Sequence, residues 1–201
     1  MEVVFSSVYA GNLDYYSCLL KSDKFRIDVH ENYIKQTYRN RCDIYGANGK
    51  LSLIIPIVRK GNAPIKDVLI DYSQNWQKIH WKSLESSYRS SPYFEFYEDK
   101  FVHLYEQKNI RFLQDFNMEL QNIFFQLIGI ETVCLFTEMY HKEIKDVIDL
   151  RNSIHPKKDA TIYYNGIKYN QVFEEKMGFL SNLSIYDLLF NEGPASLNII
   201  E

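Results

Sequence analysis

Residues 1–29, MEVVFSSVYAGNLDYYSCLLKSDKFRIDV, contain the alternation that decides the class of fold. Val3–Phe5 is short and apolar and predicts a strand, and the alternating residues of Lys24–Val29 predict a second strand. Between them, residues 12–21 predict a short helix that begins at Asn12. Helices and strands therefore both contribute to the expected core.

A hairpin and further short strands are expected after this beginning. Cys42–Tyr45 and Lys50–Val58 flank Gly46–Gly49, whose glycine and asparagine residues tolerate a positive φ, so the three segments predict a hairpin. Ile65–Ile70 is another predicted strand. Thr132–Thr137 is a short apolar run bounded by glutamates, which predicts a buried strand.

The middle of the chain is predicted to be helical. Three helices are expected there, at Trp76–Arg89, Phe94–Gln107 and Arg111–Leu127. Asn75 is placed to cap the first of them, and Gly129 is a natural stop for the third.

Shorter helices are predicted nearer the C-terminus. They are Lys142–Leu150, Val172–Met177 and Ser184–Phe190, the last with Asp187 completing a capping box, and Ile154–Asn170 is predicted to be loop or hairpin. The order of elements predicts an α/β or α+β fold, with N-terminal strands and a hairpin in a mixed sheet packed by a central run of helices. Residues 1–201 are expected to form one domain.

Composition limits the classes of function. The chain has 201 residues, of which 46% are hydrophobic and 15% aromatic, and this excludes a disordered protein. A net charge of −3 argues against general nucleic-acid binding. The N-terminus lacks the features of a signal peptide, and no run approaches the roughly 18 apolar residues of a membrane span. We therefore expect a cytoplasmic protein without a membrane span.

Cysteine usage agrees with that location. Cys18, Cys42 and Cys134 are odd in number and far apart, which is not the spacing of a disulfide framework or a zinc site. Reduced thiols are expected. The alternative is a nucleophile at Cys42, because the neighbouring Arg41 would lower a thiol pKa.

The polar segment that follows the second strand is the main functional signal. Residues 35–60 contain one acid, Asp43, and six cations: Lys35, Arg39, Arg41, Lys50, Arg59 and Lys60. This local positive charge favours an anionic ligand such as a phosphate or a carboxylate. The alternative is a solvated edge hairpin protected by its lysines.

Two histidines are candidate general bases. His30 stands where the second strand should end, and a carboxylate at Asp28 or Glu31 would orient its ring. His80 shares a helix face with Trp76. The alternatives are a surface histidine at position 30 and a satisfied core histidine at position 80.

Standard catalytic motifs are missing from the sequence. HExxH, CxxC, P-loop, GxGxxG and GxSxG patterns do not occur, which disfavours zinc proteases, P-loop NTPases, Rossmann dehydrogenases and α/β-hydrolases. No metal spacing is found and the cofactor is unknown. Amides at Gln36 and Asn40, next to Arg41, are the side chains that would bind a sugar or a nucleotide edge. The alternative is that they hydrogen-bond to the backbone of their own loop.

An ordered set of segments resembles the WbqC-like protein family and spans almost the whole chain. The segments are His30–Ile44, Ala47–Gly49, Leu53–Val58, Asp67–Asp71, Trp76–Trp81, Ser91–Phe94 and Asn182–Phe190. The resemblance implies a role in bacterial surface polysaccharide, because members occur in O-antigen gene clusters and a glycine-transferase role has been proposed for some.

The resemblance also points to particular residues. The residues that match the family's shared polar positions are Gln36, Asn40, Arg41, Lys60 and His80. Many members carry His-Gln-Pro after the first strand, where this sequence has Phe5-Ser-Ser. If that histidine is catalytic in the relatives, this chain either belongs to a divergent subgroup or uses His30 instead.

Three hypotheses follow. The first is a transferase that moves a glycyl or other small acyl group onto a sugar, with His30 or His80 as general base and Asn40, Arg41 and Lys60 holding the donor or an oxyanion. The second is a non-catalytic protein that binds a sugar nucleotide or glycan. In both, the expected partner is an anionic small molecule such as a nucleotide sugar.

The third hypothesis is a nucleotide- or sugar-processing enzyme of another reaction type, for example an isomerase or a nucleotidyl transfer enzyme, in which carboxylates could hold a metal. Its carboxylates would come from Asp28, Glu31, Asp67 and Asp71, whose alternative role is as solvated strand ends.

Overall fold

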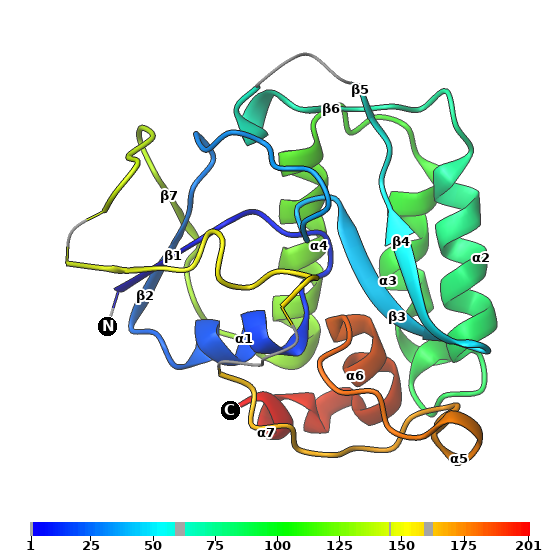
Figure 1. The fold of residues 1–201 in the computed structure, drawn as a ribbon. Coiled ribbons are helices and arrows are strands. Elements are labelled where there is room, and N and C mark those ends of the chain that lie inside the picture. Colours follow the sequence, from blue (N-terminus) through cyan, green and yellow to red (C-terminus); the bar gives the residue numbers. More distant parts are fainter. Residues whose placement is uncertain (1, 59–62, 145, 159–162) are drawn as a thin grey trace.

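A parallel sheet of four strands, in the order β7-β2-β1-β8, forms one side of the molecule in the computed structural model (Figure 1). β1 (Glu2–Phe5) pairs with β2 (Lys24–Ile27) on one side and with β8 (Ile148–Asp149) on the other, and β7 (Leu135–Phe136) lies beyond β2. The structure describes residues 2–58, 63–144, 146–158 and 163–201.

The helix between the first two strands makes their parallel pairing possible. α1 (Leu13–Leu20) carries the chain back from the end of β1 to the start of β2, as a parallel pair requires. Asn12 caps this helix, because its side-chain oxygen accepts a hydrogen bond from the N–H of Tyr15 at 3.1 Å. The predicted strand-helix-strand beginning is confirmed.

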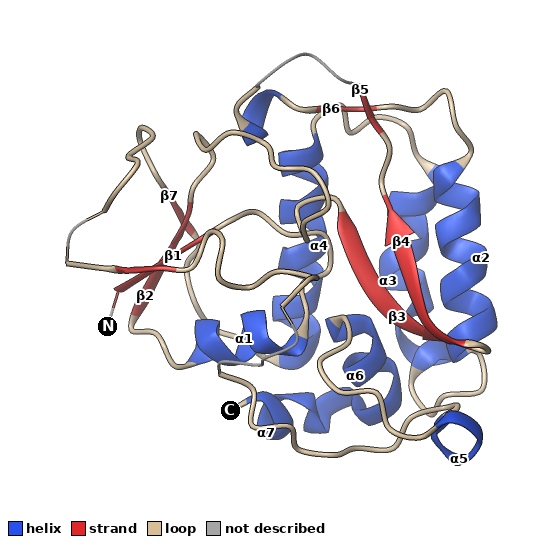
Figure 2. Ribbon diagram, viewed as in Figure 1, coloured by secondary structure: helices blue, strands red, loops and turns tan. Residues whose placement is uncertain are grey.

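The predicted hairpin is confirmed as a separate antiparallel ribbon (Figure 2). β3 (Arg41–Gly46) pairs with β4 (Gly49–Ile54), and residues 47–48 form the two-residue turn. Gly49 has a φ of 101°, which a side chain would strain. Because residues alternate along a strand, Cys42 is buried on one face while Arg41 lies on the other.

A third, small sheet follows the hairpin. β5 (Ile57–Val58) pairs with β6 (Leu69–Ile70), and a 3₁₀ turn, η1 (Ile65–Asp67), lies between them. The strand predicted over Ile65–Ile70 is therefore wrong in its first half. The N–H of Val68 bonds to the carbonyl of Ile65 at 3.2 Å, which turns the chain before a strand can begin.

The central helices are confirmed and pack an aromatic core. They are α2 (Trp76–Tyr88), α3 (Phe94–Glu106) and α4 (Leu113–Ile128). Gly129 ends α4 in the left-handed conformation with a φ of 83°, as predicted. Phe101 of α3, Phe124 of α4 and Tyr186 are buried with ring centroids 4.8–5.2 Å apart. The mixed α/β class of the fold is thus confirmed.

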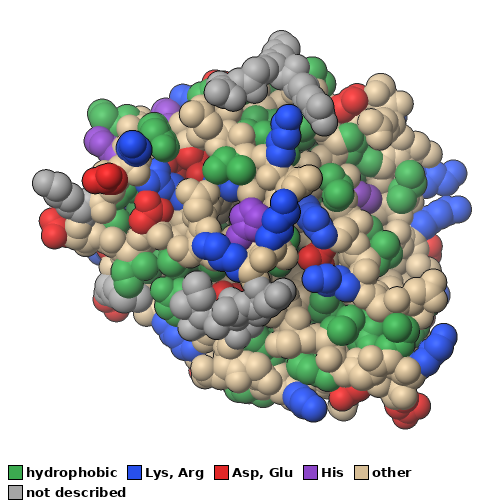
Figure 3. Space-filling view, in the orientation of Figure 1, with side chains coloured by type: hydrophobic (Ala, Val, Ile, Leu, Met, Phe, Trp, Pro, Cys, Tyr) green, Lys and Arg blue, Asp and Glu red, His purple; other side chains and the backbone are tan. Residues whose placement is uncertain are grey.

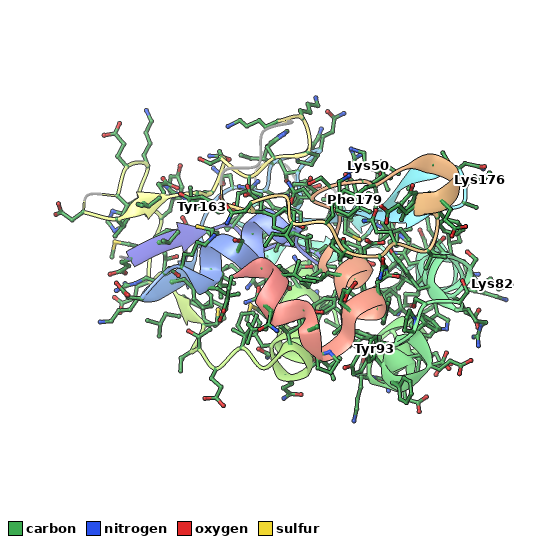
Figure 4. The ribbon with its side chains drawn as sticks, turned by 90° about the horizontal axis from the view of Figure 1, so that it is seen from below. Lys50, Lys82, Tyr93, Tyr163, Lys176 and Phe179 are labelled. Carbon is green, nitrogen blue, oxygen red and sulfur yellow. The ribbon has the colours of Figure 1, made fainter. Side chains whose placement is uncertain are left out.

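Short helices close the C-terminal part of the chain. They are α5 (Glu174–Met177), α6 (Ile185–Glu192), the 3₁₀ turn η2 (Gly193–Ala195) and α7 (Ser196–Ile200). Seen from below, the segment that carries Lys176 lies across the hairpin turn near Lys50 (Figure 4). The hydroxyl of Tyr45 on β3 donates to the carbonyl of Gly178 at 2.5 Å and ties the two together. Gly193, with a φ of 53°, has the ring of Tyr93 within 2.6 Å of where a Cβ would stand.

Several local predictions are wrong for tertiary reasons. Lys142–Leu150 is not a helix, since its described part contains β8, which is held beside β1 by the bond from the N–H of Leu150 to the carbonyl of Val4. In the run Thr132–Thr137 only β7 is strand, and Leu135 and Phe136 are exposed because β7 is an edge strand.

Two predicted helix caps also differ from expectation. Asn75 makes no side-chain bond to α2. Ser184 does cap α6, but Asp187 does not complete a capping box. Its carboxylate turns inward and accepts hydrogen bonds from Tyr88, Tyr169 and Gln171 at 2.7–2.9 Å.

Candidate functional site

A cavity of about 680 Å³ lies between the polar segment, the end of the hairpin and the β5–β6 region. A cavity of this size holds a small molecule. In the view of Figure 3, Lys and Arg side chains gather near the middle of the face that carries the hairpin. The described residues that line the cavity are Tyr33, Lys35, Gln36, Asn40, Arg41, Ile54, Ile55, Pro56, Ile57, Val58, Ala63, Asp67, Val68, Leu69 and Gln74.

Asn40 holds the polar segment against the strand that forms the opposite wall. Its carbonyl accepts the N–H of Ile55 at 2.8 Å, and its side-chain Nδ2 donates to the carbonyl of the same residue at 2.7 Å. Its Oδ1 accepts the hydroxyl of Tyr33 at 2.9 Å, and the N–H of Tyr33 bonds to the carbonyl of Ala63 at 3.0 Å. The predicted binding residue Asn40 is therefore also a brace of the cavity wall.

Arg41 is oriented by residues of its own hairpin. Its Nε donates to Oδ1 of Asp43 at 3.2 Å and its Nη2 donates to Oγ of Ser52 at 2.6 Å, on the outward face that the strand pairing dictates. Lys50 lies 3.9 Å from the other oxygen of Asp43. The Arg41 side chain is 27% exposed, and its Nη1 has no hydrogen-bond partner within the described ranges. It can therefore hold an anion in the cavity with little reorganisation.

Lys35 and Gln36 complete the polar wall. Both are exposed, and Gln36 has a φ of 58°, in the left-handed region that is uncommon for residues other than glycine. A backbone of this kind marks a position whose neighbours hold it in place, and such positions are frequent at ligand sites. Lys60, the remaining predicted binding residue, lies outside the described residues.

His80 lies in the protein interior and does not line the cavity. The residue is 4% exposed, its Nδ1 is 3.0 Å from the hydroxyl of Tyr9, and its ring packs edge-on with that of Trp76. The chain of hydroxyl contacts continues from Tyr9 to Tyr105 at 2.8 Å and from Tyr105 to Tyr186 at 2.9 Å. Burial lowers the pKa of His80 to about 4, although a hydrogen bond to the backbone of Ile54 opposes the shift.

His30 lies at the end of β2, half-buried, and is not among the cavity-lining residues. Its N–H donates to Oδ1 of Asp28 at 3.0 Å, but that carboxylate is committed elsewhere. Oδ2 of Asp28 accepts Nη1 of Arg151 at 2.7 Å, and Oδ1 also accepts the hydroxyl of Thr137 at 2.9 Å. The expectation that Asp28 orients the His30 ring is thus replaced by a role for Asp28 in joining β2 to the neighbouring strands.

Glu31 and Arg39 form a buried, bidentate ion pair. Nε of Arg39 donates to Oε1 of Glu31 at 2.9 Å and Nη2 donates to Oε2 at 2.6 Å, with side chains only 2% and 5% exposed. Burial raises the pKa of Glu31, and the guanidinium of Arg39 opposes this. Arg39, counted among the cations of the polar segment, is therefore neutralised and faces away from solvent.

These pairs fill the carboxyl edge of the parallel sheet, where the sequence predicts His30 to act. Arg151, just after β8, bonds Asp28 and Asp149 and donates to the carbonyls of His141 and Lys142. Arg151 could not be predicted from the sequence, because its partners Asp28 and Ser6 are 123 and 145 positions away along the chain.

Carboxylates and thiols do not gather for metal or nucleophile chemistry within the part of the chain that the structure describes. Asp67 lines the cavity, whereas the pKa of Asp71 is lowered by hydrogen bonds from the side chain and the N–H of Ser73. No group of three or more His, Cys, Asp or Glu side chains is placed to hold a metal there. Cys42 faces the core and burial raises its pKa well above the usual range, which argues against the nucleophile alternative.

Comparison with known proteins identifies the family. The WbqC-like protein family matches residues 7–177, which include every described residue of the cavity. The chain belongs to this family. A protein of Mycobacterium tuberculosis (strain ATCC 25618 / H37Rv) named Uncharacterized protein Rv1507c is 26% identical to this WbqC-like chain over 205 residues, which cover 89% of this chain and 88% of that protein. No solved structure matches the chain.

Among the described residues of this WbqC-like chain, no helix is both long and apolar enough to cross a bilayer.

Proposed function

We propose that the cavity binds an anionic sugar derivative, of which a nucleotide sugar is an example, and that the protein is a transferase in the biosynthesis of a bacterial surface polysaccharide. The observation that carries this proposal is the convergence of Lys35, Gln36, Asn40 and Arg41 on one cavity. Membership of the WbqC-like family supports the polysaccharide role.

The proposed roles follow from the geometry of these side chains. Arg41 binds the phosphate or carboxylate through Nη1, which has no hydrogen-bond partner among the described residues, and Lys35 adds a second positive charge. The amides of Gln36 and Asn40 can bond to sugar hydroxyls. The reaction is the transfer of a glycyl or other small acyl group to a hydroxyl or an amine of the sugar.

A second candidate, a non-catalytic binding protein, is favoured by the positions of the two histidines. His80 is buried against Tyr9 and Trp76, and His30 lies at the edge of the parallel sheet. Of the described lining residues, Asp67 is the one carboxylate. In a transferase, Asp67 or a group on the acceptor would have to take up the proton that the acceptor hydroxyl or amine loses.

A thermal-shift panel on the purified protein tests binding. It contains nucleotide sugars, free nucleotides, glycine, acyl-coenzyme A thioesters, pyridoxal phosphate and divalent metals. A ligand at 100 times its dissociation constant stabilises the fold by about 2.7 kcal/mol, which raises the Tm of a protein this size by about 5–10 °C. If a ligand raises the Tm of the wild-type protein but not that of Arg41→Met, the result supports the proposed site.

Turnover separates the two candidates. Incubation with a bound sugar derivative and glycyl or acyl donors should yield an acylated sugar, detected by mass spectrometry, and Asp67→Asn should abolish its formation while binding persists. Binding without any product would favour the non-catalytic protein. A panel in which no anion shifts the Tm would contradict both.

A further inference from the structure

The neutral walls of the cavity are aliphatic. Ile55, Ile57 and Val68 are among the residues that line it. Of the described lining residues, Tyr33 is the single aromatic one, and its hydroxyl donates to Asn40. Proteins that bind bases commonly stack them on aromatic faces, whereas aliphatic walls bind a chain by burying its apolar surface. The composition of these walls therefore fits an aliphatic chain better than a nucleobase.

Two aliphatic side chains of the same cavity are exposed to solvent. Ile54 is 51% exposed and Val58 is 40% exposed, and both line the cavity. Exposed apolar surface that continues a cavity commonly belongs to a binding site. A ligand that extends from the cavity over these two residues would remove their apolar surface from water.

The charge of the cavity lies directly beside this apolar rim. Arg41 and Ile54 are cross-strand partners in the hairpin, which places their side chains next to each other on one face. Lys35 lines the cavity as well. A ligand that contacts both features must carry its negative charge close to an aliphatic chain.

We propose that the cavity binds a phosphate ester of a flexible aliphatic chain, with the phosphate at Arg41 and Lys35 and the chain along Ile54, Ile57 and Val58. This inference rests on the proposed function and revises its ligand, because the anion bound at Arg41 and Lys35 is then a lipid-type phosphate rather than a nucleotide sugar. Two kinds of molecule share this chemistry, the isoprenoid phosphates and the acyl thioesters of phosphopantetheine.

Isothermal titration of the full chain tests the chemistry of the ligand. The probes are farnesyl phosphate, octanoyl-phosphopantetheine, UDP-glucose and inorganic phosphate. The two aliphatic probes are kept below their critical micelle concentrations. One of the two aliphatic phosphates should bind at least about tenfold more tightly than UDP-glucose and inorganic phosphate. Whichever of farnesyl phosphate and octanoyl-phosphopantetheine binds more tightly identifies the kind of aliphatic chain.

Variants at the rim test the location. Ile54→Ser and Val58→Ser should each weaken binding of the aliphatic phosphate about tenfold, while binding of inorganic phosphate stays unchanged. Both residues are exposed, so the fold tolerates the change. The matched control is Ile79→Ser, because Ile79 is 61% exposed on α2 and does not line the cavity. This control should bind like the wild type.

The outcomes separate this inference from the proposed function. If UDP-glucose binds more tightly than both aliphatic phosphates, the inference is overturned and the proposed function stands. If Ile79→Ser weakens binding as much as Ile54→Ser, the chain is bound non-specifically and the inference is again overturned. If no anion binds at all, both the inference and the proposed function fail.

Discussion

The buried pair of Glu31 and Arg39 gives the sharpest test of which cations in the polar segment are structural. Its side chains are 5% and 2% exposed and are joined by two hydrogen bonds, of 2.9 and 2.6 Å. Glu31→Gln removes the negative charge and leaves the guanidinium buried. Breaking a buried pair from one side in this way costs about 3–5 kcal/mol, against a total stability of about 5–15 kcal/mol.

The structure supplies only weak substitutes for the lost carboxylate. Nη2 of Arg39 also donates to the carbonyl of Arg151 at 3.2 Å and approaches Oδ1 of Asn152 at 3.5 Å, and neither acceptor carries a charge. The double variant Glu31→Leu with Arg39→Met removes both charges. It should recover most of the loss, because replacing a buried pair with apolar residues is often neutral.

The assay is urea denaturation followed by tryptophan fluorescence at pH 7, applied to Glu31→Gln and to the double-mutant cycle of Glu31→Leu, Arg39→Met and their combination. Lys35→Met is the control, since Lys35 is exposed and its removal should change stability by less than about 0.5 kcal/mol. A Glu31→Gln variant within about 1 kcal/mol of the wild type would refute the reasoning. Arg39 would then be open to a ligand-binding role.

Three further predictions follow from single residues. Burial lowers the pKa of His80 to about 4, so the free energy of unfolding of the protein should fall by about 3 kcal/mol as the pH falls from about 6.5 to 4. Burial raises the pKa of Asp187 to about 6, so the free energy of unfolding should fall by about 3 kcal/mol as the pH rises from about 4 to 6. The two effects oppose each other, and each variant keeps only one of them. Urea titrations at several pH values should therefore show that Asp187→Asn becomes less stable on acidification and that His80→Phe becomes less stable on alkalinisation. The same dependence of stability on pH in both variants would contradict this. Gln36→Gly should keep the Tm of the free protein, since glycine tolerates a φ of 58°, while the Tm shift caused by the cavity ligand shrinks, and an unchanged shift would remove Gln36 from the site. Gly193→Ala should cost about 1–3 kcal/mol more than Gly129→Ala in urea denaturation, because an added Cβ clashes with a ring at the first position and meets nothing within 4 Å at the second.

The candidate site was only partly predictable from the sequence. Gln36, Asn40 and Arg41 occur close together along the chain, so local charge and amide content sufficed to group them, and the structure places all three at one cavity. The aliphatic wall was missed. Residues 54–58 resemble a continuous strand in the sequence, and only their pairing with distant segments shows that they line a cavity.

Elements whose causes are local could be predicted from the sequence alone. Asn12 begins α1 through a bond to its own first turn, Gly129 ends α4 through its own φ, and the two-residue turn before Gly49 sets the register of the hairpin. Each of these depends on residues only a few positions apart, so periodicity and capping rules are enough to predict them.

Tertiary structure alone decided the features that depend on residues far apart in the chain. β8 is a strand because β1 offers it a partner, not because of its own residues. Asp28 pairs with Arg151 across 123 positions, and Asp187 turns inward to two tyrosines and a glutamine instead of capping its helix. A buried charge or an unpaired backbone must find a partner somewhere, and only the assembled fold determines which one is near.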